Sequence, residues 1–485
     1  MPQSWHMTKR KILSDSLSSF VICALMMLVS ATTLHAYPLG AQLEREIPLL
    51  MERHGVAGVN ALILREGREV WAESFGMADP EAAIAMTRDR VFRVESISKP
   101  VTALGVMRLV ERGEVALDDV VWEHIASWAP PSGTPEMTIR QLLSNSAGLG
   151  IGDFTARHPP GTAPSLRAAL ERDFEVIGTP GAAFHYSNIG FNLLEILIED
   201  VSGQDFADFM DEAVLSPLGA GQVSFDWSPA LAEKMPVGHG LQAQRIAPHV
   251  YPARASGGLL ADIDDLARFV RVGIHAPHRA AEVGLPDTLL TLMHTAHVPV
   301  GGVYGVASDG YGLGHFTETL SDGRKAVWHG GQGYGWMSHV HLVPESGDAI
   351  ILLTNSQRAW PLFAEVLRAW SGTLGVAPVG MARVAYIWTL GLAMTLALAL
   401  GAAAQALRLA ISWRRGLRQS QRPTLARSVL ALGGGGLIAI VAWAAMQEYL
   451  IIDSVLPGLS LWLRLASAAA GLMLLLSAIF APHRS

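Results

Sequence analysis

Three short groups of residues in this 485-residue chain have the types and spacing of a hydrolytic site. The first is Ser96-Ile97-Ser98-Lys99, the only S-x-x-K in the chain. Residues at i and i+3 share a helix face, so the Ser96 hydroxyl and the Lys99 amine can approach each other at the start of a predicted helix. The positive helix end disfavours a protonated amine, so Lys99 could be the base that activates Ser96 as a nucleophile. The alternative for this motif alone is a helix-capping serine with an exposed lysine.

The second group is Tyr186-Ser187-Asn188, the only Y-x-N in the chain. A tyrosine beside an activated lysine can relay a proton to a leaving group. The asparagine amide can hold a substrate carbonyl. The alternative is a loop tyrosine followed by a helix-capping asparagine.

The third group is Trp328-His329-Gly330-Gly331, which falls on a predicted strand. Glycines weaken a strand unless a ligand or another backbone comes close. The backbone N–H of Gln332, together with that of Ser96, would then form an oxyanion hole. The alternative is a β-bulge with a surface histidine.

In the order S-x-x-K, Y-x-N and H-G-G, these groups resemble the serine β-lactamase and penicillin-binding family, in its branch of class C β-lactamases, D-aminopeptidases and esterases. The neighbouring sequence agrees. Residues 91–103 resemble the family's nucleophile segment, and 255–269 resemble its G-G-L…D-L-A-x-F stretch. Residues 141–149 are similar to L-L-x-H-x-S-G-L, with Asn145 in place of histidine. The resemblance covers about residues 40–370 and implies a β-lactamase/transpeptidase-like fold.

The resemblance also implies a role for each matching residue. These are Ser96 as the acylated nucleophile, Lys99 as its base, Tyr186 as proton shuttle, Asn188 as ligand of the substrate amide, and His329, Gly330 and Gly331 at the K-T-G position. Histidine departs from that motif, because at its ordinary pKa it is mostly neutral at pH 7 and gives a substrate carboxylate no fixed positive charge. In this respect the chain resembles the esterase and peptidase members. No metal or organic cofactor is implied.

The elements that must position these residues show a clear order. Residues 59–64 and 70–75 have the pattern of a β-hairpin, and β-rich runs follow at 325–331, 336–343 and 348–354. Between them, helical patterns run from Ser96 to Arg112 and at 138–144, 165–173, 190–202, 204–213, 262–274 and 362–370. Pairing of the end strands predicts one antiparallel sheet flanked by helices, an α+β fold. His339 and His341 alternate along one predicted strand, as surface residues often do.

Composition separates a soluble middle from apolar ends. Half of the residues are hydrophobic, 16% are charged, and the single cysteine permits neither an intramolecular disulfide nor a cysteine-based metal site. The net charge of −7 excludes a generally basic nucleic-acid binder. We therefore expect domains at 1–36, 37–371 and 384–480, with a linker at 372–383.

The last region holds three apolar segments, at about 384–407, 429–446 and 459–480. Each is near the roughly 20 residues that cross a bilayer. Six arginines lie between the first two segments, whereas Glu448 and Asp453 lie between the second and third. The positive-inside rule predicts a multi-pass protein of the bacterial cytoplasmic (inner) membrane, in contact with lipid and with residues 37–371 on the extracytoplasmic side.

The first 36 residues have the pattern of an export signal. Lys9 to Lys11 are basic, and residues 17–34 are apolar apart from serine and threonine. This is typical of a signal peptide cleaved after Ala31 or Ala36, or of an uncleaved N-terminal anchor. Both alternatives place the middle region outside the cytoplasm.

These features together predict a membrane-tethered serine hydrolase. Its substrate would be a small-molecule or peptide ester or amide, such as a D-amino-acid peptide, a cell-wall fragment or a β-lactam. The alternative is a membrane sensor that is acylated without turnover, which a tail of several helices favours. A third reading is a catalytically dead scaffold, against which the intact Ser96, Lys99, Tyr186 and Asn188 stand.

Overall fold

A single antiparallel sheet forms the centre of the globular part. The computed structural model describes residues 38–275, 285–420, 424–447 and 451–482, so the predicted signal peptide or anchor at 1–36 lies outside it. Within these residues the sheet has nine strands in the order β3-β2-β1-β13-β12-β11-β10-β9-β8. Their bounds are β1 Gly58–Arg65, β2 Arg68–Asp79, β3 Ile84–Ala85, β8 Val298–Pro299, β9 Gly310–Tyr311, β10 Phe316–Thr319, β11 Lys325–Gln332, β12 Met337–Val343 and β13 Asp348–Thr354. The predicted pairing of strands from the two ends is confirmed, because β1 pairs with β13.

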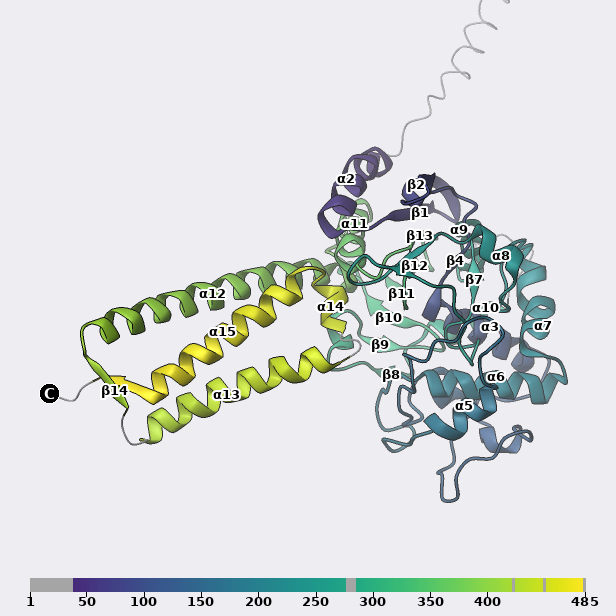
Figure 1. Cartoon of the computed structure of the whole chain (residues 1–485). Coiled ribbons are helices and arrows are strands. Elements are labelled where there is room, and N and C mark those ends of the chain that lie inside the picture. Colours follow the sequence, from purple (N-terminus) through teal and green to yellow (C-terminus); the bar gives the residue numbers. More distant parts are fainter. Residues whose placement is uncertain (1–37, 276–284, 421–423, 448–450, 483–485) are drawn as a thin grey trace, which may run out of the picture.

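Helices cover both faces of this sheet (Figure 1). Helices α2 (Pro38–His54) and α11 (Trp360–Thr373) pack on one face, against alternate β1 residues such as Ile63. Helices α3 (Ser98–Glu111), α6 (Asn188–Ser202) and α9 (Ile263–Val272) belong to the core on the other face, with Leu62. Strand β1 is thus buried on both faces, which explains the apolar run from Ala61 to Leu64.

The remaining elements of the globular part are short. The helices are α4 Ile139–Leu143, α5 Leu166–Asp173, α7 Phe206–Met210, α8 Pro229–Lys234 and α10 Asp287–His294, and the strands are β4 Phe92–Arg93, β5 Gly238–His239, β6 Arg245–Ile246 and β7 Leu260–Ala261. Most of the helices lie where the sequence predicts them. The surface assignment of His339 and His341 is wrong: both side chains are buried, packed near the aromatic rings of α11.

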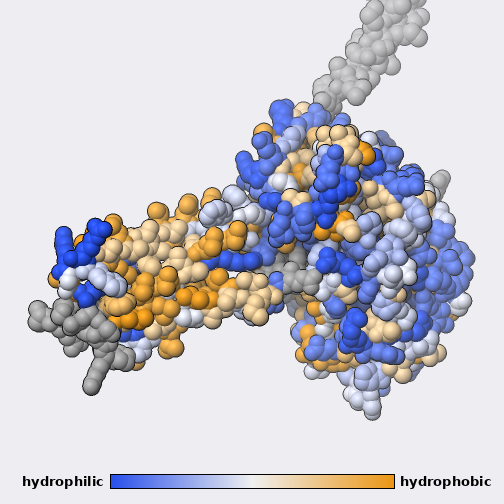
Figure 2. Space-filling view, viewed as in Figure 1, coloured by the Kyte–Doolittle hydropathy of each residue, from blue (hydrophilic) through white to orange (hydrophobic). Residues whose placement is uncertain are grey.

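Three long helices extend away from the globular part as an arm (Figure 1). They are α12 (Val384–Arg414), α13 (Leu425–Met446) and α15 (Leu459–Ile479), and each is long and apolar enough to cross a membrane. Figure 2 shows a mostly apolar surface along this arm. The glycine run in α13 does not break the helix. A Cβ at Gly434 would lie 2.6 Å from the Gly471 carbonyl oxygen, so glycine allows α13 and α15 to approach closely.

The arm is joined firmly to the globular part. The predicted linker 372–383 is partly helical and partly buried: α11 extends to Thr373, and a 3₁₀ turn, η6 (Gly380–Arg383), leads directly into α12. Val379 and Ala382 are buried in the core beneath the sheet. The short helix α14 (Ile451–Val455) also packs on α11, and its Asp453 forms an ion pair with Arg464 of α15.

Candidate active site

Ser96 lies in a tight turn just before α3. The helix begins at Ser98, not at Ser96 as predicted, and Ser96 occupies a 3₁₀ turn, η1 (Glu95–Ile97). The turn starts at Glu95, whose φ of 51° is uncommon for a residue with a side chain. The Ser98 hydroxyl donates to the Glu95 carbonyl oxygen at 2.6 Å and accepts from the Leu259 N–H at 3.0 Å. These bonds fix the turn that presents the Ser96 hydroxyl.

The Lys99 amine is fully buried beside Ser96. Its Nζ lies 3.2 Å from Ser96 Oγ, 2.7 Å from Asn188 Oδ1 and 2.7 Å from the Ser256 carbonyl oxygen. Burial lowers the pKa of Lys99 from 10.5 to about 7, and the opposing attraction of Glu95 is smaller. The reading of Lys99 as an exposed lysine is therefore wrong, and much of the amine is neutral near pH 7.

The Ser256 carbonyl, which accepts from Lys99, is held in place by side chains of two helices, α6 and α3. The Glu195 carboxylate of α6 accepts from the N–H groups of Arg254 and Ala255, at 2.7 and 2.8 Å. Thr102 of α3 donates to the Ala255 carbonyl oxygen at 3.0 Å. Because Ser256 follows directly, its carbonyl is aimed at Lys99 by groups that lie far apart in the sequence.

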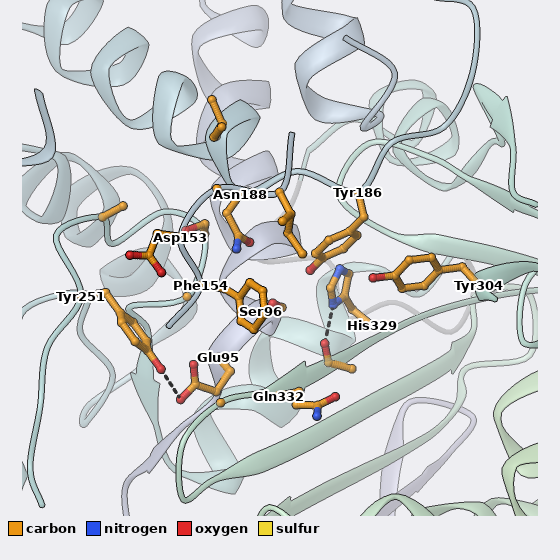
Figure 3. Close-up of a pocket in the computed structure, with 18 of the residues that line it drawn as sticks. Glu95, Ser96, Asp153, Phe154, Tyr186, Asn188, Tyr251, Tyr304, His329 and Gln332 are labelled. Atoms are coloured by element: carbon orange, nitrogen blue, oxygen red, sulfur yellow. Dashed lines mark hydrogen bonds between the residues drawn. The ribbon is translucent and has the colours of Figure 1, made fainter. Parts of the chain in front are cut away.

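Tyr186 and Asn188 approach Ser96 from the start of α6 (Figure 3). The helix is capped by Ser187, whose hydroxyl accepts from the Gly190 N–H at 3.0 Å, so the reading of Asn188 as the cap is wrong. The Tyr186 hydroxyl hydrogen-bonds with Ser96, and burial raises the pKa of this phenol. Asn145 accepts from the Ser187 N–H at 3.0 Å and thereby anchors the Y-x-N segment.

His329 is buried and neutral. Its Nδ1–H donates to the Gly330 carbonyl oxygen at 2.8 Å, so Nε2 is the unprotonated nitrogen and accepts from the Tyr311 hydroxyl at 3.2 Å. Burial, reinforced by Lys99, lowers its pKa well below the ordinary value. The reading of a surface histidine is wrong, and His329 offers no positive charge to a substrate carboxylate.

The two glycines after His329 are required by close packing. A Cβ at Gly331 would lie 2.1 Å from Ser338 Oγ and 2.2 Å from the Val94 carbonyl oxygen. A Cβ at Gly330 would lie 2.6 Å from the Trp360 ring. Gly331 therefore allows β11 to lie directly against the turn that carries Ser96, and Gly330 leaves room for the Trp360 ring of α11.

The backbone N–H of Gln332 does not bond to the neighbouring strand β12. Gly333 N–H bonds to the Trp336 carbonyl oxygen, so the adjoining pair Gln332 and Met337 is a non-hydrogen-bonded pair of the antiparallel ladder. The Gln332 N–H then points away from β12, on the edge where β10 pairs no further than Trp328. The Gln332 side chain bonds elsewhere: its Oε1 accepts from Trp360 Nε1 at 2.8 Å, and its Nε2 donates to Ser454 Oγ at 2.7 Å.

A cavity of about 480 Å³ opens at Ser96 and contains a carboxylate, that of Glu95, which is not among the predicted site residues. Glu95 is buried, Tyr251 Oη lies 3.4 Å from its Oε1, and burial raises the pKa of the carboxyl group. A Cβ at Gly333 would collide with this carboxylate, which explains that glycine. The only sequence signal was the position of Glu95 directly before Ser96. Among the described residues, no group of three or more His, Cys, Asp or Glu side chains is placed to hold a metal ion.

Comparisons with known proteins agree on one family. The family model described as "Beta-lactamase" matches residues 43–438. Esterase EstB of Burkholderia gladioli is 27% identical over 378 residues, covering 67% of this chain and 93% of that protein. The solved penicillin-binding protein homologue from Pyrococcus abyssi has a TM-score of 0.61 and 25% identity, covering 70% of this chain and 78% of that one. SurE has a TM-score of 0.59 and 30% identity, covering 71% and 77%.

Proposed function

The chain belongs to the beta-lactamase family, and from this premise we propose that it is a membrane-tethered, extracytoplasmic hydrolase that cleaves an ester or amide through an acyl-enzyme on Ser96. Relatives in this family are serine hydrolases with esterase, amidase or carboxypeptidase activity. The observation that carries the proposal is the environment of Lys99.

A neutral Lys99 has two N–H bonds and one lone pair. Asn188 Oδ1 and the Ser256 carbonyl oxygen only accept hydrogen bonds, so they take both N–H bonds. The lone pair is then left for the Ser96 hydroxyl at 3.2 Å. This arrangement supports Lys99 as the general base, because a proton acceptor must lie within hydrogen-bond reach of the proton it removes.

Acylation then follows from the positions of these groups. The Ser96 proton passes to Lys99 Nζ while Oγ attacks the substrate carbonyl carbon. The N–H groups of Ser96 and Gln332 hold the oxygen that becomes negative. Asn188 accepts from Lys99 through Oδ1, so its NH₂ group is free to donate to a substrate amide. The proton passes from Lys99 through Tyr186 to the leaving alcohol or amine as its bond to the carbonyl carbon breaks.

Deacylation reverses these proton movements. Water attacks the acyl carbonyl carbon, and as its proton passes to Tyr186, Tyr186 passes its own proton to Lys99 Nζ. The bond from Ser96 Oγ to the acyl carbon breaks, and Oγ recovers a proton. The products are a carboxylic acid and free Ser96, and no metal or organic cofactor takes part in these steps.

The neutral His329 limits the classes of substrate that the site would bind. Penicillins and D-alanyl peptides carry a carboxylate, and buried charge without a partner is costly. His329 cannot supply that partner because its pKa is lowered well below the ordinary value. We therefore favour esters and amides without a carboxylate at this position over β-lactams.

The arm supports tethering and orientation. Arg408, Arg414 and Arg415 lie toward the end of α12 that is far from the globular part, where Figure 2 shows a hydrophilic cluster. Because positively charged loops stay in the cytoplasm, this end would be cytoplasmic and the globular part extracytoplasmic.

Steady-state hydrolysis tests the proposal. The full chain and its Ser96→Ala variant would be given p-nitrophenyl acetate, a D-alanyl p-nitroanilide and nitrocefin. We expect turnover of the ester by the unaltered protein, weak or no turnover of nitrocefin, and a loss of at least 1000-fold in Ser96→Ala. Equal rates in the two proteins would refute the proposal.

A second candidate function is a sensor that is acylated but turns over slowly. The observation that favours it is the bond from Gln332, the proposed oxyanion residue, to Ser454 of α14. Binding of an acyl group at the oxyanion site would change the contact between Gln332 and α14, and α14 lies directly before the apolar helix α15 in the sequence. The lifetime of the acyl group on Ser96 separates the two functions: seconds indicate an enzyme, and hours indicate a sensor.

A further inference from the structure

The cavity at Ser96 is built partly by the membrane arm. Its lining includes Met381 of η6, Val384 and Ile387 from the first turn of α12, and Val455 of α14. These side chains are all apolar, and they follow the hydrolase domain predicted at residues 37–371. The arm therefore supplies part of the wall of the substrate cavity.

Hydrogen bonds hold this wall in place at two points. Gln332 Nε2 donates to Ser454 Oγ at 2.7 Å, which joins β11 to α14. Arg383 Nη1 donates to the Val306 carbonyl oxygen at 2.7 Å, which joins the start of α12 to the loop at 303–306. The apolar wall is thus a fixed part of the site.

The loop beside this wall exposes apolar side chains. Val303 and Val306 line the cavity and are 66% and 41% exposed. Exposed apolar residues at the edge of a pocket indicate contact with an apolar partner. Because Arg383 holds this loop next to α12, the exposed valines lie where the arm meets the globular part.

The length of α12 places this junction at a membrane surface. Its 31 residues extend about 46 Å at 1.5 Å per residue, whereas the hydrocarbon core is about 30 Å thick. About 20 residues counted back from Arg408 reach Trp388, so Val384 and Ile387 lie at the outer boundary. The apolar end of the cavity therefore lies at the level of the outer leaflet.

The opposite end of the cavity is charged. Asp153, Arg172 and Asp173 line it there, and Arg172 forms an ion pair with Asp173 at 2.6 Å. Figure 3 shows Asp153 and Tyr304 on opposite sides of Ser96, with Tyr304 next to the loop that exposes Val303. The cavity thus runs from a charged end, past the nucleophile, to an apolar end at the membrane.

We propose that the substrate is an amphiphile of the outer leaflet, an ester or amide with a long apolar acyl chain. The carbonyl carbon of that chain reaches Ser96, the chain lies along Met381, Val384, Ile387 and Val455, and the polar group extends toward Asp153 and Arg172. The proposal rests on the proposed function and explains why a soluble type of hydrolase domain is docked on membrane helices.

Chain-length dependence tests this substrate class. The full chain would be reconstituted in phosphatidylcholine vesicles and given p-nitrophenyl acetate and p-nitrophenyl decanoate. Each buried methylene contributes about a fourfold factor, so kcat/KM for the decanoate should exceed that for the acetate by at least about 100-fold. A ratio near one would overturn the proposal.

Two variants would fill the apolar end of the cavity with a larger side chain, and one matched control would not. Ile387→Trp should lower the decanoate-to-acetate ratio at least tenfold, and Val455→Phe, on a separate helix, should lower it in the same direction. Leu390→Trp introduces the same ring one turn along α12, at a residue that is 68% exposed and absent from the cavity lining, and should leave the ratio unchanged. An unchanged ratio in both cavity variants would overturn the proposal.

The same assay keeps the two proposals distinguishable. If acetate is hydrolysed with dependence on Ser96 but without preference for the longer chain, only the amphiphile proposal fails. If no ester is hydrolysed with dependence on Ser96, the proposed function itself fails.

Discussion

The globular part buries polar and charged side chains at its candidate site, whereas the arm exposes apolar side chains on its surface. Lys99, Glu95 and His329 are at most 3% exposed, and each has hydrogen-bonding or charged neighbours in the interior. In the arm, Leu432 and Met446 are 75% and 82% exposed. Buried polar groups are tolerated when paired, and exposed apolar helices are tolerated in lipid. The comparison shows a globular part with a buried polar site and an arm long and apolar enough to cross a membrane, and residues of the arm line part of the cavity at Ser96.

Removal of the buried amine should have the largest effect. Lys99→Met keeps much of the side-chain volume but removes the base, so kcat/KM for p-nitrophenyl acetate should fall by roughly 10²- to 10⁴-fold. The matched control is Lys234→Met, at an exposed lysine, which should keep full activity. A Lys99→Met protein that is correctly folded and fully active would show that the buried Lys99 amine is not the base.

A charge placed on the arm should have the next largest effect. Leu432→Arg puts a cation on the exposed face of α13 and should cost roughly 3 kcal/mol of membrane insertion. Leu49 of α2 is also highly exposed, at 61%, but on the globular part. Leu49→Arg should therefore change stability by less than about 0.5 kcal/mol.

Alkaline extraction of membranes measures this difference. The Leu432→Arg protein should be extracted more readily than the unaltered protein, and the Leu49→Arg protein should not. If both variants are retained equally, α13 does not face lipid.

A methyl group at Gly331 should disturb the site through packing alone. In Gly331→Ala the new Cβ would collide with the Val94 carbonyl oxygen, so β11 must move away from the turn that carries Ser96. We expect a loss of about 1–3 kcal/mol in the free energy of unfolding. Displacement of the Gln332 N–H should lower kcat by up to about 100-fold. In the control Gly301→Ala the Cβ meets open space. Thermal unfolding and ester hydrolysis would measure both, and a Gly331→Ala protein equal to the control contradicts this packing.

The pH profile gives the smallest and most specific effect. Lys99 acts as a base only when neutral, and its pKa is about 7, so kcat/KM should fall about tenfold per pH unit below 7 and level off above it. The negative charge of Glu95 raises the pKa of Lys99. Glu95→Gln should therefore shift the acidic limb to lower pH. An unchanged acidic limb would show that this charge does not act on Lys99, and a shift to higher pH would contradict the sign of the effect.

Much of the catalytic domain could be predicted because its signals are local. The strands β11, β12 and β13 have short apolar runs separated by turn residues, and the i, i+3 spacing of S-x-x-K brings Ser96 and Lys99 to the same side of a helical turn. The site residues Ser96, Lys99, Tyr186, Asn188 and His329 come together in the structure. Their catalytic roles remain proposals.

The features that could not be predicted depend on contacts between segments that lie far apart in the sequence. The burial of His339 and His341 is set by α11, which the strand pattern cannot show. The environment of Glu95 is set by Tyr251 and Gly333. The share of the arm in the cavity depends on how α12 and α14 dock, and their apolar sequences indicate only a membrane segment. Helix α2 contains Pro48, which is unusual inside a helix, and it is not among the predicted helices.

Detection of the acyl-enzyme tests the central claim most directly. The full chain and its Ser96→Ala variant would be mixed with p-nitrophenyl decanoate, quenched in acid within milliseconds to seconds, and examined by intact-mass and peptide mass spectrometry. We expect a decanoyl adduct on the peptide that contains Ser96, appearing before steady state and lost as substrate is consumed, and no adduct in Ser96→Ala. Turnover without any adduct on Ser96, or the same adduct in the variant, would contradict the account.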